Sequence, residues 1–171
     1  MNSDQVSLAD LSALRIQLGR EPRGIRAIKV RCECGWPTVV ETEPRLADGT
    51  PFPTFWYLTC RALSAALSTL ESEGVMRDMQ DRLASDPDLA DHYRRAHVQY
   101  LQARDAAGIV DEIAGFSAGG MPTRVKCLHA LAAHSLAAGP GVNPFGDEAM
   151  DLVTERGLWP HTGPCVTPAV Q

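Results

Sequence analysis

The residues best suited to chemistry are gathered in Phe116–Pro144, which reads FSAGGMPTRVKCLHALAAHSLAAGPGVNP. The adjacent Gly119 and Gly120 would let the backbone approach a ligand closely, and the free N–H groups at a helix start favour an anion. Arg124 and Lys126 follow at once, so we expect a phosphate group to bind here. The alternative is a simple tight turn beside solvated cations, since the spacing matches neither a Walker loop nor a dinucleotide-binding fingerprint.

Three further reactive side chains, Cys127, His129 and His134, follow in the same segment. Proline suits the first position of a helix and glycine the position past its end, so we expect one helix from Pro122 to just before Gly139. A thiol nucleophile assisted by a histidine is one role for these residues, although the sequence identifies neither an oxyanion donor nor an orienting carboxylate. Cys127 and His134 are roughly 10 Å apart along the helix, too far for both to bind one metal ion.

Four cysteines are candidates for a shared metal site. Cys32 and Cys34 stand at the end of an expected strand, and Cys60 ends a later one. The helix that carries Cys127 is apolar on all sides, so we expect Cys32, Cys60 and Cys127 to lie near one another in the interior. Tetrahedral sulfur ligation suits zinc or an iron–sulfur cluster. The alternative is that these cysteines are core residues without a metal.

The hydrophobic pattern predicts the elements that position these residues. Alternating and β-branched runs indicate strands in IRAIKVRCECG, TVVET and TFWYLTC. Apolar residues at helical spacing indicate helices before the first strand, after Cys60, and over a long stretch opened by Pro87. The first of these helices has a predicted cap, because Ser7 can cap it and Asp10 stands three residues on. We therefore expect an α+β fold, in which a small antiparallel sheet of about three strands is packed by several helices. Residues 1–156 should form this single domain, and residues 157–171 a flexible C-terminal tail.

Composition limits the class of partner. The chain has 171 residues and a formal charge of −5, which argues against general nucleic-acid binding because such binding needs many cations to neutralise phosphates. No apolar run is long enough to span a membrane, and no signal peptide is recognisable, so we expect a cytoplasmic protein. Five cysteines, an odd number, do not suggest a disulfide framework in a reducing compartment.

Several longer motifs occur in order along the chain: REPRG, PRLADGTPFPTFWYLTC, GVMRDMQDRL, YRRAH and SAGGMPTRVKCLHALAAHSLAAGPGVNPFGDEA. With them the chain resembles the actinobacterial family known as domain of unknown function 501, over roughly residues 10–155. The resemblance implies no established activity. Genes of the family often lie beside an exopolyphosphatase-like phosphatase and a septum-formation initiator, which implies a link with phosphate metabolism or cell division.

Two functions from different classes remain open. The first is an enzyme or binding protein for a phosphate-bearing small molecule, with the anion at the paired glycines and a thiol or imidazole near the reacting group. The second is a non-catalytic adaptor that meets a protein partner through its helical surface and contains a structural metal. A deep pocket at the glycine turn favours the first function, and an exposed apolar patch without a pocket favours the second.

Overall fold

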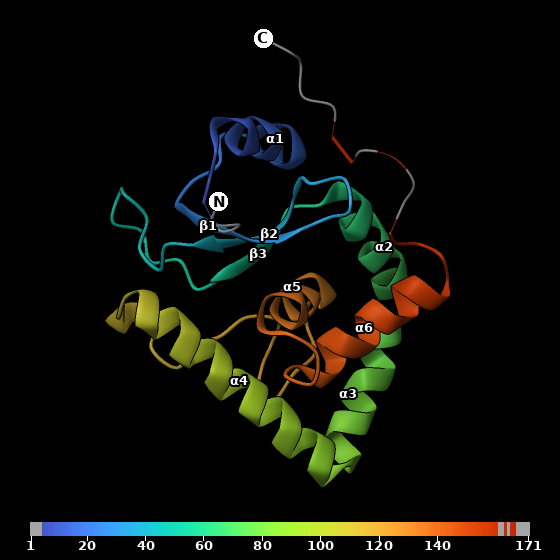
Figure 1. The fold of residues 1–171 in the computed structure, drawn as a ribbon. Coiled ribbons are helices and arrows are strands. Elements are labelled where there is room, and N and C mark those ends of the chain that lie inside the picture. Colours follow the sequence, from blue (N-terminus) through green and yellow to red (C-terminus); the bar gives the residue numbers. More distant parts are fainter. Residues whose placement is uncertain (1–4, 161–162, 164, 167–171) are drawn as a thin grey trace.

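A small antiparallel sheet separates the protein into layers (Figure 1). The computed structural model describes residues 5–160, 163, 165 and 166. Within them, three strands lie in the order β1 (Ile25–Arg31), β2 (Pro37–Thr42) and β3 (Trp56–Leu58), and both neighbouring pairs are antiparallel. Helix α1 (Leu8–Leu18) lies on one side of the sheet and α5 (Leu128–Ala138) on the other. The predicted α+β fold with a small antiparallel sheet is confirmed.

Helix α5 lies among the other helices that follow the sheet (Figure 1). These are α2 (Arg61–Ser72), α3 (Val75–Ser85), α4 (Pro87–Ala107) and α6 (Pro144–Glu155), with a short 3-10 turn at Asp111–Ile113. The small side chains of its sequence LHALAAHSLAA let its neighbours come close. A Cβ on Gly146 of α6 would lie only 2.2 Å from the carbonyl oxygen of Leu131 in α5. The predicted burial of this helix is confirmed for most of its length, because six of its residues are buried.

Strand β2 is buried on both faces. On the face toward α1, Val40 packs with Ile28 of β1 and Leu14. On the opposite face, Val39 and Trp56 belong to the main core, which they share with helices α2 to α6. A strand between two apolar layers needs hydrophobic residues in succession rather than alternation, which explains the sequence PTVVET.

Helix α1 begins with the predicted cap. The hydroxyl of Ser7 accepts from the backbone N–H of Asp10 (3.1 Å), and the carboxylate of Asp10 accepts from the backbone N–H of Ser7 (2.9 Å). Asp10 also binds the guanidinium of Arg31 at the end of β1, with 2.6 Å between Nη1 and Oδ1. This hydrogen bond lowers the pKa of Asp10 to about 2, although burial opposes the shift. The cap thus also ties α1 to the strand end that precedes Cys32.

The helix predicted from Pro122 begins only at Leu128, so the predicted start is wrong. The intervening backbone has hydrogen-bond partners outside the helix. The side-chain amide of Gln80 in α3 donates to the carbonyl of Thr123 (3.3 Å) and accepts from the N–H of Val125 (3.0 Å). This partner, distant in sequence, satisfies backbone groups that would otherwise favour an earlier helical turn. The chain therefore forms turns and irregular structure before α5 starts at Leu128.

The last residues that the structure describes lie against the core. Leu158, Trp159 and Cys165 pack against the main cluster, and Val166 is buried. The rest of the predicted tail, residues 161, 162, 164 and 167–171, lies outside the described residues. The domain boundary after residue 156 therefore stays a prediction.

Helix α4, with 21 residues the longest of the described helices, carries paired charges on its exposed face: Asp91 pairs with both Arg94 and Arg95. In the part of the chain that the structure describes, no helix combines the length and the apolar character that crossing a membrane requires.

Candidate active site

The turn at Gly119 and Gly120 packs against its own chain. Both residues have positive φ, +69° and +96°, which favours glycine. A Cβ on Gly119 would lie 2.5 Å from Cδ2 of Leu131, and one on Gly120 would lie 2.7 Å from the carbonyl oxygen of Arg124. Close contacts within the chain therefore account for both glycines. We expected this turn to stand at a helix N-terminus, but α5 begins only at Leu128. Anion binding at the turn stays a prediction.

Cys127 is the last extended residue before α5. Its thiol is half-buried and lies in a group with two other reactive side chains. One ligand atom from each of Cys127, His129 and Glu71 lies within 4.8 Å of the other two. The first N–H groups of α5 carry the positive end of the helix dipole, which favours a negative charge on the sulfur.

His129 presents both ring nitrogens to hydrogen-bond acceptors. Nδ1 lies 3.2 Å from Oε1 of Glu71, and Nε2 lies 3.1 Å from the carbonyl oxygen of Ser64. The Ser68 hydroxyl also lies 3.3 Å from Nε2 and can accept from it. Both nitrogens thus have an acceptor, which favours the imidazolium form of the ring. The neighbouring Cys127 and the charge of Glu71 together raise the pKa of His129 to about 9, against the opposing effect of burial.

The pKa of Cys127 is lowered, which favours a negative thiolate beside the positive ring of His129. Burial raises the pKa of Cys127, but the neighbouring His129 ring and the backbone N–H of Ala130 lower it by more, to below its usual value. A thiol with a lowered pKa beside a histidine with a raised one favours a thiolate–imidazolium pair. The thiolate is the nucleophilic form of cysteine and also the form that binds metals.

Glu71 supplies the orienting carboxylate that the sequence did not identify. It lies on α2 with Ser64 and Ser68, and spacings of four and three residues place all three on one face of the helix. The sequence pattern that could have pointed to Glu71 is this row of polar residues. Each of them directly follows a buried leucine of α2 in the chain. Oε1 of Glu71 also accepts the N–H of Leu128 (2.7 Å), which fixes the carboxylate against the first turn of α5.

A groove runs beside the site. It has a volume of about 410 Å³ and lies between the end of α1, strand β3 and the first half of α2. Ser64 and Ser68, which contact Nε2 of His129, form part of its wall, and Arg61 lines it closer to the start of α2. Cys127, His129 and Glu71 do not themselves line this groove, but two residues that contact the imidazole edge do.

Cys127 does not join the other cysteines. Cys60 directly precedes α2, whereas Glu71, the partner of the Cys127 site, lies near the far end of that helix. The rise along an α-helix places these two positions about 16 Å apart. The expectation that Cys127 would lie near Cys32 and Cys60 is therefore wrong. The burial expected for Cys60 is confirmed.

Cys165, and not Cys127, lies beside Cys32 and Cys34. The sulfur of Cys165 lies 3.5 Å from that of Cys32 and 3.2 Å from that of Cys34, and the two latter residues are bonded to each other as a disulfide. Cys60 is a further neighbour of Cys165. No pattern in the sequence points to Cys165, because this residue stands in the segment predicted to be a tail.

His134 lies in the core and not beside Cys127. Its Nε2 donates to the side-chain oxygen of Gln99 (2.7 Å), and its Nδ1 accepts from the amide of Asn143 (3.1 Å). The ring also stacks on Trp56, with 5.1 Å between ring centroids. Burial lowers the pKa of His134 to about 4, so the ring is neutral at physiological pH. These are the contacts of a packed core side chain.

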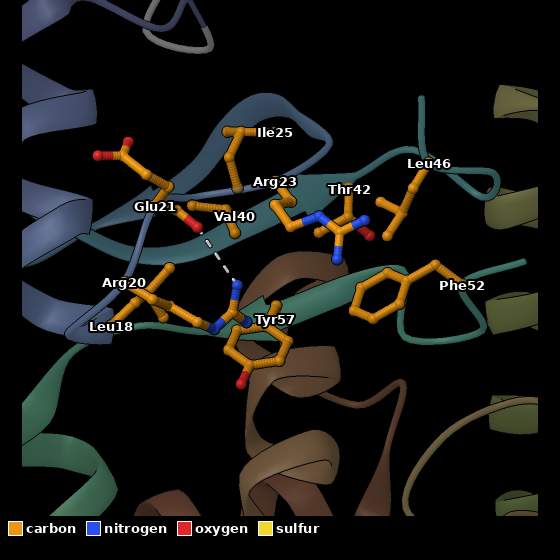
Figure 2. A pocket seen from close by; sticks show the side chains of 10 residues that line it. All are labelled: Leu18, Arg20, Glu21, Arg23, Ile25, Val40, Thr42, Leu46, Phe52 and Tyr57. Carbon is orange, nitrogen blue, oxygen red and sulfur yellow. Dashed lines mark hydrogen bonds between the residues drawn. The ribbon is translucent and has the colours of Figure 1, made fainter. Parts of the chain in front are cut away.

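A separate cavity of about 410 Å³ opens between α1 and the adjacent face of the sheet (Figure 2). Its lining consists of Leu18, Arg20, Glu21, Arg23, Ile25, Val40, Thr42, Leu46, Phe52 and Tyr57. The cations of this region mostly have carboxylate partners: Arg23 pairs with Asp48 and Arg15 with Glu21. The cavity contains none of the predicted site residues.

Comparison with known proteins identifies one family. A family model described as "Protein of unknown function (DUF501)" matches residues 28–151. Searches of the curated proteins and of the solved structures found no match. The matched range includes Glu71, Cys127 and His129.

Proposed function

The chain belongs to the DUF501 family of proteins of unknown function, and we propose that it is an enzyme whose cysteine nucleophile acts on a phosphate-bearing small molecule. Cys127 is the nucleophile, His129 the proton donor, and Glu71 the carboxylate that orients the ring. One observation carries this proposal. Both nitrogens of His129 have an acceptor, the Glu71 carboxylate at Nδ1 and the Ser64 carbonyl at Nε2, and this arrangement favours an imidazolium beside the Cys127 thiol.

The reaction proceeds in two steps. In the first, the Cys127 thiolate forms a bond to an electrophilic atom of the substrate, the bond to the leaving group breaks, and His129 gives that group a proton. In the second, the neutral His129 takes a proton from water, whose oxygen displaces the sulfur and restores the thiolate. Glu71 holds the ring in place throughout and stabilises its positive charge.

The substrate class follows from the charges around Cys127. Arg124 and Lys126 are exposed and directly precede the cysteine in the chain, and His129 adds a third positive charge. Arg61 lines the groove that passes the imidazole edge. Phosphate groups bind where cations and helix N-terminal N–H groups meet. In this proposal Gly119 and Gly120 form the turn that positions Arg124 and Lys126 rather than the whole phosphate site.

Alkylation by iodoacetamide, followed by peptide mass spectrometry across a pH series, tests the nucleophile. We expect Cys127 to react several-fold faster at pH 7 than in the His129→Gln variant, because the His129 ring lowers the pKa of Cys127 and so increases the share of thiolate. Inorganic pyrophosphate should slow the reaction. Arg124→Ala should weaken pyrophosphate binding by about 1.5–3 kcal/mol, the value of a charge-assisted hydrogen bond.

The matched control is Arg94→Ala, which removes an exposed arginine from α4 without touching the site. Its pyrophosphate protection should equal that of the wild type. Equal alkylation rates in the wild type and His129→Gln at every pH would contradict the thiolate–imidazolium pair. If Cys127 is reactive but pyrophosphate does not protect it, the proposal of a phosphate-bearing substrate is wrong. The assignment of Cys127 as nucleophile would still stand.

A metal ion is the alternative occupant of the same site. Nδ1 of His129, a carboxylate oxygen of Glu71 and the sulfur of Cys127 converge, while Nε2 donates to a backbone carbonyl, as the second nitrogen of a metal-bound histidine usually does. Three such ligands leave a fourth position on zinc for water. If zinc copurifies with the protein and is lost in Cys127→Ser, the cysteine is a ligand and not a free nucleophile.

The adaptor function remains the alternative from another class. It is favoured by the group of cysteines at the end of β1, which suits a structural role. A protein that shows no reactive thiol at Cys127 and no phosphate binding would support it. A cytoplasmic location and an actinobacterial source, which the sequence implies, stay predictions.

A further inference from the structure

Four cysteines from three distant parts of the chain meet at one edge of the sheet. The sulfurs of Cys32, Cys34 and Cys165 lie within 4.8 Å of one another. Cys60 neighbours Cys165 but stands outside this group of three, so it has to move closer to complete a site. We propose that these four residues bind a single structural zinc ion, which joins the turn after β1, the start of α2 and the C-terminal segment. This site is independent of the proposed enzyme activity at Cys127.

The spacing of the sulfurs fits one metal ion. Zinc–sulfur bonds of 2.3 Å in a tetrahedron place neighbouring sulfurs about 3.8 Å apart. The distances from Cys165 to Cys32 and Cys34 are 3.5 and 3.2 Å, so a small outward shift makes room for the ion. An iron–sulfur cluster places several irons and sulfides between its thiolates and therefore needs them farther apart.

Cys60 is the fourth ligand. It is fully buried and stands at the N-cap of α2, beside the first N–H groups of that helix. A site with four thiolates carries a net negative charge, which the positive end of the helix dipole stabilises. The side chain of Gln17, itself buried, also lies against Cys165 and donates through Nε2 to the carbonyl of Pro37 (2.8 Å). Its second amide hydrogen is available to a thiolate.

The disulfide between Cys32 and Cys34 is the oxidised, metal-free state of the same site. A small-molecule dithiol reduces it by transferring two electrons and two protons, and is itself converted to a disulfide. The four thiols then lose their protons as zinc binds. In a reducing compartment the zinc form is favoured. A small-molecule disulfide that takes two electrons from the Cys32 and Cys34 thiolates, and is itself reduced to two thiols, re-forms the disulfide and releases the ion.

Metal analysis of protein purified anaerobically with a reductant tests the proposal. We expect about one zinc per chain, and X-ray absorption of the wild type should give four sulfur neighbours at about 2.3 Å. Cobalt in place of zinc should show sulfur-to-metal charge transfer and the visible bands of a tetrahedral site. Cys165→Ser should lower zinc affinity at least about tenfold, as loss of one ligand does.

The matched control is Cys127→Ser, which removes a cysteine from the other group and should keep the zinc. Zinc content and X-ray absorption are measured on the wild-type protein, so the test does not depend on whether a cysteine variant folds. Reduced wild-type protein that takes up no zinc would overturn the proposal. So would a bound zinc with one sulfur and nitrogen or oxygen neighbours, because that is the coordination expected from Cys127, His129 and Glu71. Zinc affinity unchanged in Cys60→Ala would overturn the assignment of the fourth ligand.

Discussion

His129 and His134 stand on the same helix, and their pKa values move in opposite directions. The pKa of His129 is raised to about 9, and that of His134 is lowered to about 4. His129 lies in the first turn of α5, half-buried, between a thiol and a carboxylate. His134 lies in the middle of the helix, fully buried, among neutral amides and aromatic rings.

The difference shows what decides whether a histidine does chemistry. Burial disfavours the charged ring at both positions, but only His129 has an anionic partner that outweighs this cost. The hydrogen bonds agree, since His129 donates from both nitrogens whereas His134 donates from one and accepts at the other. His134 stabilises the fold, and His129 forms a charged pair at the edge of a groove.

The largest expected effect is the loss of stability in His134→Ala. The change removes a fully buried ring that stacks on Trp56, and it leaves the amide of Asn143 without its acceptor. We expect the free energy of unfolding to fall by about 3–5 kcal/mol, measured by denaturant titration. His129→Ala should cost clearly less, because that ring is half-buried. Equal losses in the two variants would remove the distinction between a core histidine and a site histidine.

A second difference should appear on acidification. The folded-state pKa of His134 lies below its unfolded value of 6.5, so its contribution to stability is complete above pH 6.5 and is lost as the pH falls through about 4. One proton changes the free energy of unfolding by at most about 1.4 kcal/mol per pH unit. His129, protonated in the folded state throughout this window, adds no loss.

Denaturant titrations between pH 4 and 6.5 measure this dependence. Below about pH 5.5, where His129 is protonated in both the folded and the unfolded chain, His134→Gln should flatten the curve, whereas His129→Gln should leave its slope unchanged. His97, whose pKa is also lowered by burial, contributes with the same sign in all three proteins and cancels in the comparison. A curve for His134→Gln as steep as that of the wild type would show that other groups cause the acid sensitivity.

The sequence predicted those elements whose causes are local. The cap at Ser7 and Asp10, the three strands and the long helix opened by Pro87 were all recognised, because capping residues, alternation and proline act over a few neighbours. The inward position of Cys60 also followed from alternation, and the structure confirms its burial.

The parts of the site that the sequence did not predict depend on partners far along the chain. The helix expected from Pro122 is delayed because Gln80 binds the intervening backbone. Glu71 reaches His129 only because α2 packs against α5, and a periodic pattern does not say which helices pack together. Cys165 was overlooked because a proline-rich segment without periodicity gives no sign of where it folds back.

The smallest expected effect is on the pKa of His129 itself in Glu71→Gln. This variant keeps the size of the side chain and an acceptor for Nδ1 but removes the negative charge. An opposite charge within hydrogen-bond distance raises the pKa of a histidine, and here it acts second to the neighbouring Cys127 at a site partly open to water. We therefore expect the pKa of His129 to fall by about one unit, measured by NMR titration of the imidazole signals.

His134 is the internal control, because no carboxylate touches it among the described residues, and its ring should stay neutral down to about pH 4 in both proteins. An unchanged His129 titration would show that Glu71 does not orient a charged ring, and the assignment of proton donor would then depend on Cys127 alone.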